Sequence, residues 1–120
     1  MTGVVDGSGR ALLGVRLRHP TSGVETNLDA WIDTGFTGEL VVPQVQITGL
    51  GLPLGPLIRA RLADGSDVEL ETYLCLLEWF GSWKQIEIIA VTGQYPLLGV
   101  GLLLGHESHI DYRMQTLTLL

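Results

Sequence analysis

The chain has 120 residues, a formal net charge of -6 and a hydrophobic content of 46%. Seven Lys and Arg residues against thirteen Asp and Glu residues argue against the clustered basic surface that phosphate backbones require, so we expect no nucleic-acid partner. The single cysteine, Cys75, excludes an intramolecular disulfide and a cysteine-based zinc site, and we expect it to fill part of the core.

No basic leader followed by a long apolar run opens the chain, since Ala11-Leu12-Leu13 is too short for a signal segment or a membrane span. We therefore expect no membrane partner, and a lone cysteine suits a cytoplasmic location. The histidines, His19, His106 and His109, lack a further ligand at a recognisable spacing, so we expect no metal site and no cofactor.

The first third of the chain predicts a β-hairpin. Residues 10–18 end in an alternation of Val15 and Leu17 with charged neighbours, which is typical of a half-buried strand. The turn-forming run Pro-Thr-Ser-Gly at 20–23 then leads into a second alternating run at 24–32. Two such runs joined by a short turn indicate antiparallel strands.

The middle of the chain predicts a short strand at 40–42, stopped by Pro43, and a single helical turn within 44–50. Five Gly and Pro residues between 49 and 56 forbid regular structure there. Beyond them, two strand-like runs at 57–62 and 68–77 flank Ala-Asp-Gly-Ser, whose Asp-Gly pair predicts a two-residue hairpin turn.

The last third predicts a strand at 84–91 and, between 96 and 105, a buried run, a glycine and a short apolar helix capped by Gly105. Strand-like runs follow at 108–112 and 117–120, and the apolar run 117–120 predicts an edge strand that invites pairing with another chain. Many short strands with at most two short helices indicate an all-β fold built on a closed or folded sheet.

The segment 28–42 places an acidic residue, Asp33, in a polar turn between two apolar runs. The alternating run 28–32 delivers Asp33 into the polar turn 34–38, after which the chain turns apolar again at 40–42. A carboxylate enclosed in this way is costly unless it is used or paired, although Asp33 could also simply bond the backbone of its own turn. Gly35 permits backbone angles that other residues avoid.

Three features, in this order, resemble the retropepsin-like aspartic proteases: Asp33-Thr34-Gly35 before an apolar strand, the hairpin around Asp64-Gly65, and Leu97-Leu98-Gly99 before an apolar helix. The resemblance covers most of the chain and implies one retropepsin-like domain over 1–120, folded as a closed acid-protease β-barrel. The sequence departs from the family where Phe36 and Thr37 follow the glycine, in place of small residues.

The resemblance also implies roles for individual residues. Asp33 is the expected catalytic residue, Thr34 is expected to lock two active-site loops together, and Gly35 is expected to let a peptide substrate approach the backbone. The expected flap, which binds substrate, is Ala63, Asp64 and Gly65. Leu97, Leu98 and Gly99 are expected to pack beneath the catalytic loop.

Peptide hydrolysis of this type requires two carboxylates that share one proton, yet the chain holds a single Asp-Thr-Gly. The other acids that we considered, Glu39, Asp64, Asp67, Glu69 and Asp111, lack the same strand-to-turn setting. We therefore expect a homodimer in which Asp33 of each subunit completes one site for a peptide or protein substrate.

There are three alternatives to an aspartic endopeptidase. Gly99, Gly101 and Gly105 have the wrong spacing for a dinucleotide-binding fingerprint, and a hairpin-rich chain does not suit the parallel sheet of phosphoaspartate enzymes. A non-catalytic dimerising or peptide-binding module on the same fold stays open, because a fold does not determine a function.

Overall fold

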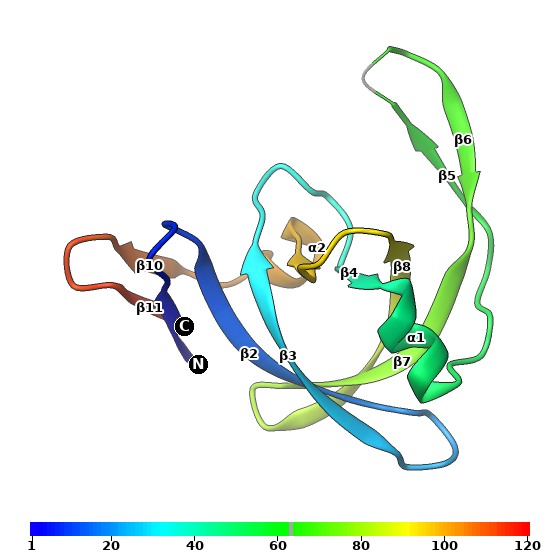
Figure 1. Ribbon diagram of the computed structural model, residues 1–120, viewed down its shortest axis with the longest axis horizontal. Coiled ribbons are helices and arrows are strands. Elements are labelled where there is room, and N and C mark those ends of the chain that lie inside the picture. The colour runs from blue at the N-terminus through cyan, green and yellow to red at the C-terminus, as the bar shows by residue number, and fades with distance from the viewer. Residues whose placement is uncertain (63) are drawn as a thin grey trace.

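In this computed structural model, residues 1–62 and 64–120 are described. They form mainly strands, with two short helices (Figure 1). The elements in chain order are β1 (Thr2–Val5), β2 (Ala11–Arg18), β3 (Glu25–Ile32), β4 (Leu40–Pro43), α1 (Gln44–Leu50), β5 (Ile58–Arg61), β6 (Asp67–Leu70), β7 (Thr72–Trp79), β8 (Ser82–Val91), β9 (Leu97–Leu98), α2 (Val100–Leu103), β10 (Ser108–Asp111) and β11 (Thr116–Leu119).

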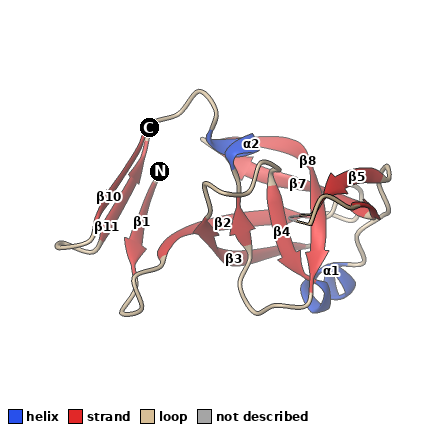
Figure 2. Cartoon of the chain, turned by 90° about the horizontal axis from the view of Figure 1, so that it is seen from above, coloured by secondary structure: helices blue, strands red, loops and turns tan. Residues whose placement is uncertain are grey.

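The strands β2, β3, β9, β4, β8 and β7 form a closed ring, because β7 pairs back onto β2. Three further strands, β1, β11 and β10, continue the same sheet outward from β2. Viewed from above, these terminal strands lie at one end of the molecule, and the separate hairpin of β5 and β6 lies at the other (Figure 2). The predicted all-β architecture is confirmed.

The interior of the ring is built by the alternation seen in the sequence. Every second side chain is buried along β2 and from Leu28 to Ile32 on β3, and the two strands pair antiparallel from Leu12 opposite Trp31 to Arg18 opposite Glu25, as predicted. Cys75 is fully buried in this core, as expected, and burial raises the pKa of its thiol to about 11. The fully buried core side chains include Leu13, Leu17, Leu40, Val42, Leu77, Ile88 and Leu98.

The run predicted as one strand at 68–77 is divided at Glu71, so that prediction is wrong. Strand β6 pairs only with β5, whereas β7 belongs to the ring. Thr72 begins β7 fully buried, and its hydroxyl donates a 2.6 Å hydrogen bond to the carbonyl of Pro56. This contact ties the base of the projecting hairpin to the ring.

The hairpin turn is longer than the predicted two residues. The N–H of Leu62 donates to the carbonyl of Ser66 at 2.8 Å, and the N–H of Gly65 donates to the carbonyl of Leu62 at 2.9 Å. Gly65 has a φ of 86°, a left-handed conformation that glycine adopts without strain. Ala63, part of the expected flap, lies outside the described residues.

The terminal strands also differ from expectation. Strand β1 was not predicted, and it covers one side of β11 while β10 covers the other. Leu117 and Leu119 are consequently buried within their own chain, so the prediction of a free edge at 117–120 is wrong. The free edge of this sheet is β10.

Both helices occur where the sequence predicted them. Helix α1 has 7 residues, longer than the expected single turn, and ends at Gly51 with a φ of 62°. Helix α2 has 4 residues and follows Gly99. In the described part of the chain, no helix has the length and apolar character needed to cross a membrane.

Candidate active site

Asp33 stands at the end of a strand that is paired on both sides. Strand β3 lies between β2 and the short strand β9, to which it runs parallel through Trp31 opposite Leu97 and Ile32 opposite Leu98. The N–H of Asp33 donates a 2.9 Å hydrogen bond to the carbonyl of Leu98, which extends this pairing by one residue. The backbone of Asp33 is therefore fixed to the core.

The side chain of Asp33 is partly buried, and one of its two carboxylate oxygens has a hydrogen-bond partner among the described residues. Its Oδ1 accepts a 2.9 Å hydrogen bond from the N–H of Gly35, and its backbone carbonyl accepts one from the N–H of Phe36 at 3.2 Å. Within residues 1–62 and 64–120, no hydrogen bond or ion pair engages Oδ2. One carboxylate oxygen thus orders the turn and the other is left for a further partner. Thr34, which follows, is exposed.

The loop that follows Asp33 rests directly on Gly99. A Cβ on Gly99 would overlap the carbonyl oxygen of Gly38 and would lie 2.6 Å from that of Phe36. Both carbonyls accept hydrogen bonds from the start of α2, from Gly101 at 2.9 Å and from Val100 at 2.8 Å. The predicted packing of Gly99 beneath the loop is confirmed, and only glycine fits at this distance.

A cavity of about 460 Å³ opens beside Asp33. Asp33 is the only carboxylate among the described residues that line it. Its wall combines this acid with apolar surface, an arrangement that suits an uncharged side chain held next to a polar group. The lining residues are Trp31, Ile32, Asp33, Thr34 and Leu97.

Trp31 joins this cavity to an aromatic cluster that the sequence did not single out. The ring of Tyr95 meets Trp31 edge-on at 6.4 Å, and the guanidinium of Arg10 lies 4.1 Å from the centroid of Tyr95. Asp6 holds Arg10 in place through a 2.7 Å ion pair. The detectable signal was the alternation of β3, which leaves Trp31 facing outward two residues before Asp33.

The other acids are engaged elsewhere in the fold. Glu39 lies 3.8 Å from Lys84, and Asp67 pairs with Arg61 at 3.2 Å. Asp64 accepts hydrogen bonds from the N–H and hydroxyl of Ser66, chiefly the hydroxyl, and these lower the pKa of its carboxyl. None of these three acids lines the cavity at Asp33.

The hairpin of β5 and β6 projects away from the ring (Figure 1). Its half-buried face carries cross-strand apolar pairs, Ile58 opposite Leu70 and Ala60 opposite Val68. Asp64 and Gly65 lie at its tip and are exposed. None of the hairpin's described residues contributes to the lining of the cavity at Asp33.

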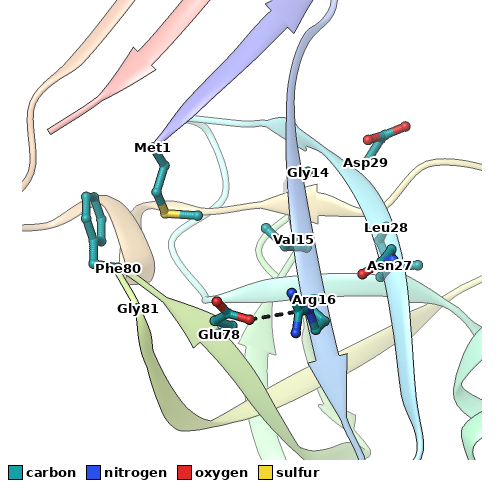
Figure 3. A pocket seen from close by; sticks show the side chains of 10 residues that line it. All are labelled: Met1, Gly14, Val15, Arg16, Asn27, Leu28, Asp29, Glu78, Phe80 and Gly81. Atoms are coloured by element: carbon teal, nitrogen blue, oxygen red, sulfur yellow. Dashed lines mark ion pairs between the residues drawn. The ribbon is translucent and has the colours of Figure 1, made fainter.

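A second cavity, of about 420 Å³, lies on the outer face of β2 and β3 and is bounded by Phe80 at the turn between β7 and β8 (Figure 3). Arg16 crosses it in a 3.3 Å ion pair with Glu78. Asn27 and Asp29 add polar groups to its rim. Asp33 does not line this cavity, which is therefore separate from the candidate site.

No protein-family model and no curated protein matches this chain. Solved structures do match it. A retropepsin-like aspartic protease from Rickettsia conorii has a TM-score of 0.67 and 18% identity over 99% of this chain and 88% of its own.

Two viral enzymes match as well. The EIAV protease, solved with the inhibitor HBY-793, has a TM-score of 0.57 and 17% identity over 82% of this chain and 88% of its own. The simian foamy virus (mac) protease has a TM-score of 0.51 and 22% identity over 73% of this chain and 86% of its own. The chain therefore has the fold of the retropepsin-like aspartic proteases.

Proposed function

We propose that this chain is an aspartic endopeptidase, that residues 1–120 form its single domain, and that Asp33 of two subunits makes one active site. The observation that carries the proposal is the placement of Asp33, fixed to β9 through Leu98, with one oxygen free beside a 460 Å³ cavity. The fold shared with aspartic proteases supports the same chemistry.

The chemistry requires a second carboxylate. One ionised Asp33 accepts a proton from a water molecule as the water oxygen attacks the peptide carbonyl carbon, while the protonated Asp33 of the partner donates its proton to the carbonyl oxygen. Collapse of the resulting diol breaks the C–N bond as the nitrogen takes a proton from one carboxyl group of the pair and a diol hydroxyl returns a proton to the other carboxylate. Because each chain supplies one such acid, a two-fold dimer is the simplest way to assemble the site.

The neighbouring residues have supporting roles in this proposal. Thr34, exposed next to Asp33, locks the two loops together across the dimer, and Gly35 orients Oδ1 and leaves room for a peptide backbone. Ala63, Asp64 and Gly65 form the tip of a flap over bound substrate. The hairpin that carries Asp64 and Gly65 supports this role, because it is anchored only at its base and presents an apolar face.

One observation favours a second candidate, a non-catalytic dimerising or peptide-binding module. The contact from Gly35 to Oδ1 of Asp33 is also what a purely structural aspartate makes in a turn. In that case the cavity beside Asp33 would bind a peptide side chain without any cleavage, and the carboxylate would act only on the stability of the loop.

Cleavage of a mixed peptide library by the wild-type chain and by Asp33→Asn, across pH, separates the two functions. Two carboxylates that face each other cannot both ionise cheaply, so the pair keeps one proton and activity follows a bell-shaped, acid-shifted pH profile. Asp33→Asn retains the hydrogen bond to Gly35 and abolishes cleavage. Cleavage that persists in Asp33→Asn rules out the protease proposal, and peptide binding without cleavage in both proteins favours the binding module.

A further inference from the structure

The second cavity, of about 420 Å³, lies where the sheet divides. Strand β1 pairs with β2 only at Ala11 and Leu12, and β7 pairs with β2 only at Leu17 and Arg18. Between these contacts, residues 13–16 of β2 have β3 on one side and, among the described residues, no paired strand on the other. The cavity lies over this unpaired stretch (Figure 3).

The backbone N–H and carbonyl of Gly14 point to the unpaired side of β2. A Cβ on Gly3 of β1 would overlap the carbonyl oxygen of Leu12, so this carbonyl points away from β3. At the other end of the gap, the thiol of Cys75 on β7 donates to the carbonyl of Arg18 at 3.5 Å, so that carbonyl points the same way. Backbone groups alternate in direction along a strand, which places those of Gly14 on the same side. They offer one donor and one acceptor to an extended ligand.

An unmatched negative charge lies across β2 from this gap. Asp29 is opposite Gly14 on β3, and within residues 1–62 and 64–120 its carboxylate has no hydrogen-bond or ion-pair partner. Among the described lining residues, Arg16 is the one cationic side chain, and Glu25 at 3.5 Å and Glu78 at 3.3 Å already neutralise it. The charge that the cavity can still accept is therefore positive.

Gly14 leaves an open path between the gap and Asp29. A ligand strand bonded to Gly14 would lie two strand spacings, about 10 Å, from β3. Only a long basic side chain, arginine or lysine, spans that distance and ends in a charge. Because Gly14 has no side chain on the outer face, such a group can cross β2 without obstruction. A glycine within a strand often marks a place where a ligand approaches closely.

Phe80 supplies an apolar wall of the cavity from a strained turn. Phe80 and Gly81 form the two-residue turn between β7 and β8, with φ of 49° and 83°. This conformation is unusual for a bulky residue, and such strain concentrates at functional sites. His106 stacks on one face of the Phe80 ring at 4.5 Å, so the exposed surface of the ring lies on its other face and edges. The side chain of Met1 also extends into the cavity (Figure 3), while its amine donates to the carbonyl of Leu119 at 2.6 Å.

We propose that this cavity is a second binding site, which holds an arginine side chain of an extended peptide segment. The peptide backbone exchanges hydrogen bonds with the N–H and carbonyl of Gly14, in the manner of an added strand. Phe80 and Met1 flank the segment, and the guanidinium crosses Gly14 to bond Asp29. Arginine suits the site better than lysine, because its planar head bonds a carboxylate through two N–H groups. The site shares no lining residue with the cavity at Asp33, so the inference does not depend on the proposed cleavage.

Peptide binding tests the site separately from any cleavage. The probe is a five-residue peptide with one arginine between threonines, and its control carries citrulline, which has a similar shape without the charge. Both are titrated into isotope-labelled Asp33→Asn, which lacks the carboxylate that cleavage would need, and the amide chemical shifts are recorded by NMR. The arginine peptide should shift the N–H of Gly14, and the citrulline peptide should bind at least about tenfold more weakly.

Two variants change the site in different ways. Asp29→Asn removes the charge that bonds the guanidinium and should weaken binding about tenfold. Glu107→Gln is its matched control, because it removes an exposed carboxylate that does not line the cavity and should leave binding unchanged. Gly14→Val places a side chain across the path to Asp29 and should abolish binding. The fold should tolerate it, since a Cβ on Gly14 meets only Oδ1 of Asp29, at an ordinary 3.7 Å.

Several results overturn the proposal. They are the absence of a shift at Gly14 with millimolar arginine peptide, equal binding of the two peptides, and equal binding by Asp29→Asn and Glu107→Gln. Shifts confined to the residues around Asp33 assign the peptide to the candidate active site and overturn the proposal as well. A chain that binds the arginine peptide at Gly14 but cleaves no peptide contradicts the proposed function and supports the second site.

Discussion

Gly99 is the position where one added methyl group should do most damage to the candidate site. Its φ of -101° and ψ of 179° are open to any residue, so Gly99→Ala carries no backbone penalty. The penalty is steric, because the new Cβ would overlap the carbonyl oxygen of Gly38 and lie 2.5 Å from the ring of Phe36. The carbonyl of Gly38 cannot retreat without stretching its bond from Gly101.

The size of the effect follows from what must move. Overpacking in a close-packed site costs about 1–3 kcal/mol, and a clash against two backbone carbonyls that are themselves hydrogen-bonded belongs at the upper end, about 3 kcal/mol. For a chain of this length, such a loss lowers the melting temperature by about 10 °C. The loop that follows Asp33 must shift to relieve the clash. The rate of peptide cleavage should therefore fall by a larger factor than the loss of folding stability alone would cause.

Thermal denaturation and peptide cleavage of Gly99→Ala measure the two effects. Gly49→Ala is the matched control, since a Cβ there meets nothing within 4 Å and an alanine in α1 should raise stability by about 0.5 kcal/mol. A melting temperature for Gly99→Ala within about 2 °C of the wild-type value would refute the reasoning, because the loop would then not rest on Gly99.

Thr72→Val removes the donor to Pro56 from a buried site and should cost about 1–3 kcal/mol in the free energy of unfolding, measured by urea denaturation. Hydrogen bonds from Arg10, chiefly from its backbone N–H, lower the pKa of the Asp6 carboxyl below 3.8. The ionised carboxylate therefore stabilises the fold fully above pH 3.8, and this stabilisation is lost as pH falls through the lowered pKa. Asp6→Asn should remove this part of the acid-induced loss of stability. Trp31→Ala removes the largest wall of the cavity beside the candidate catalytic acid and should lower kcat/KM about tenfold for peptides with large apolar side chains.

Each of these outcomes has a control. Thr116→Val changes the same atoms at an exposed position of β11 and should be neutral, and equal losses at both threonines contradict a special role for Thr72. A pH–stability curve for Asp6→Asn that overlays the wild-type curve below pH 4 contradicts the linkage. Trp83→Ala alters an aromatic residue that does not line the cavity, and equal losses in Trp83→Ala and Trp31→Ala show that Trp31 has no specific role at the site.

Most of the ring could be predicted from the sequence because its strands alternate cleanly. Every second residue is apolar along β2 and from Leu28 to Ile32 on β3, and the turn between these strands carries Pro20 and Gly23, so local chemistry and tertiary burial agree. The placement of Gly99 under the loop was predictable from its resemblance to a known motif, and the structure adds that Gly101 is packed almost as tightly.

The terminal strands could not be predicted, because their structure depends on partners distant in the sequence. Strand β1 has 4 residues with a glycine inside and becomes a strand by pairing with β11 more than 100 residues away. Without β1, the apolar residues of β11 look like an exposed edge. The break at Glu71 also depends on distant partners, since β6 pairs only with β5 while β7 pairs with β8 and β2, and Thr72 is held to Pro56 at the junction.

The candidate site was predictable in part. The Asp33-Thr34-Gly35 turn is predictable because it follows a regular strand, whereas the cluster of Trp31, Tyr95 and Arg10 draws on three separate segments, and its one local signal is the outward-facing position of Trp31 on β3.

The central claim, that two chains share one catalytic site, is tested most directly by mixing wild-type and Asp33→Asn chains and measuring peptide cleavage. At a fixed amount of wild-type chain, a ninefold excess of Asp33→Asn should, after subunit exchange, leave about one tenth of the wild-type chains paired with each other, and cleavage should fall to about one tenth. A matched excess of bovine serum albumin should leave cleavage unchanged. Undiminished cleavage in the exchanged mixture would contradict the account, because each wild-type chain would then carry a complete site of its own.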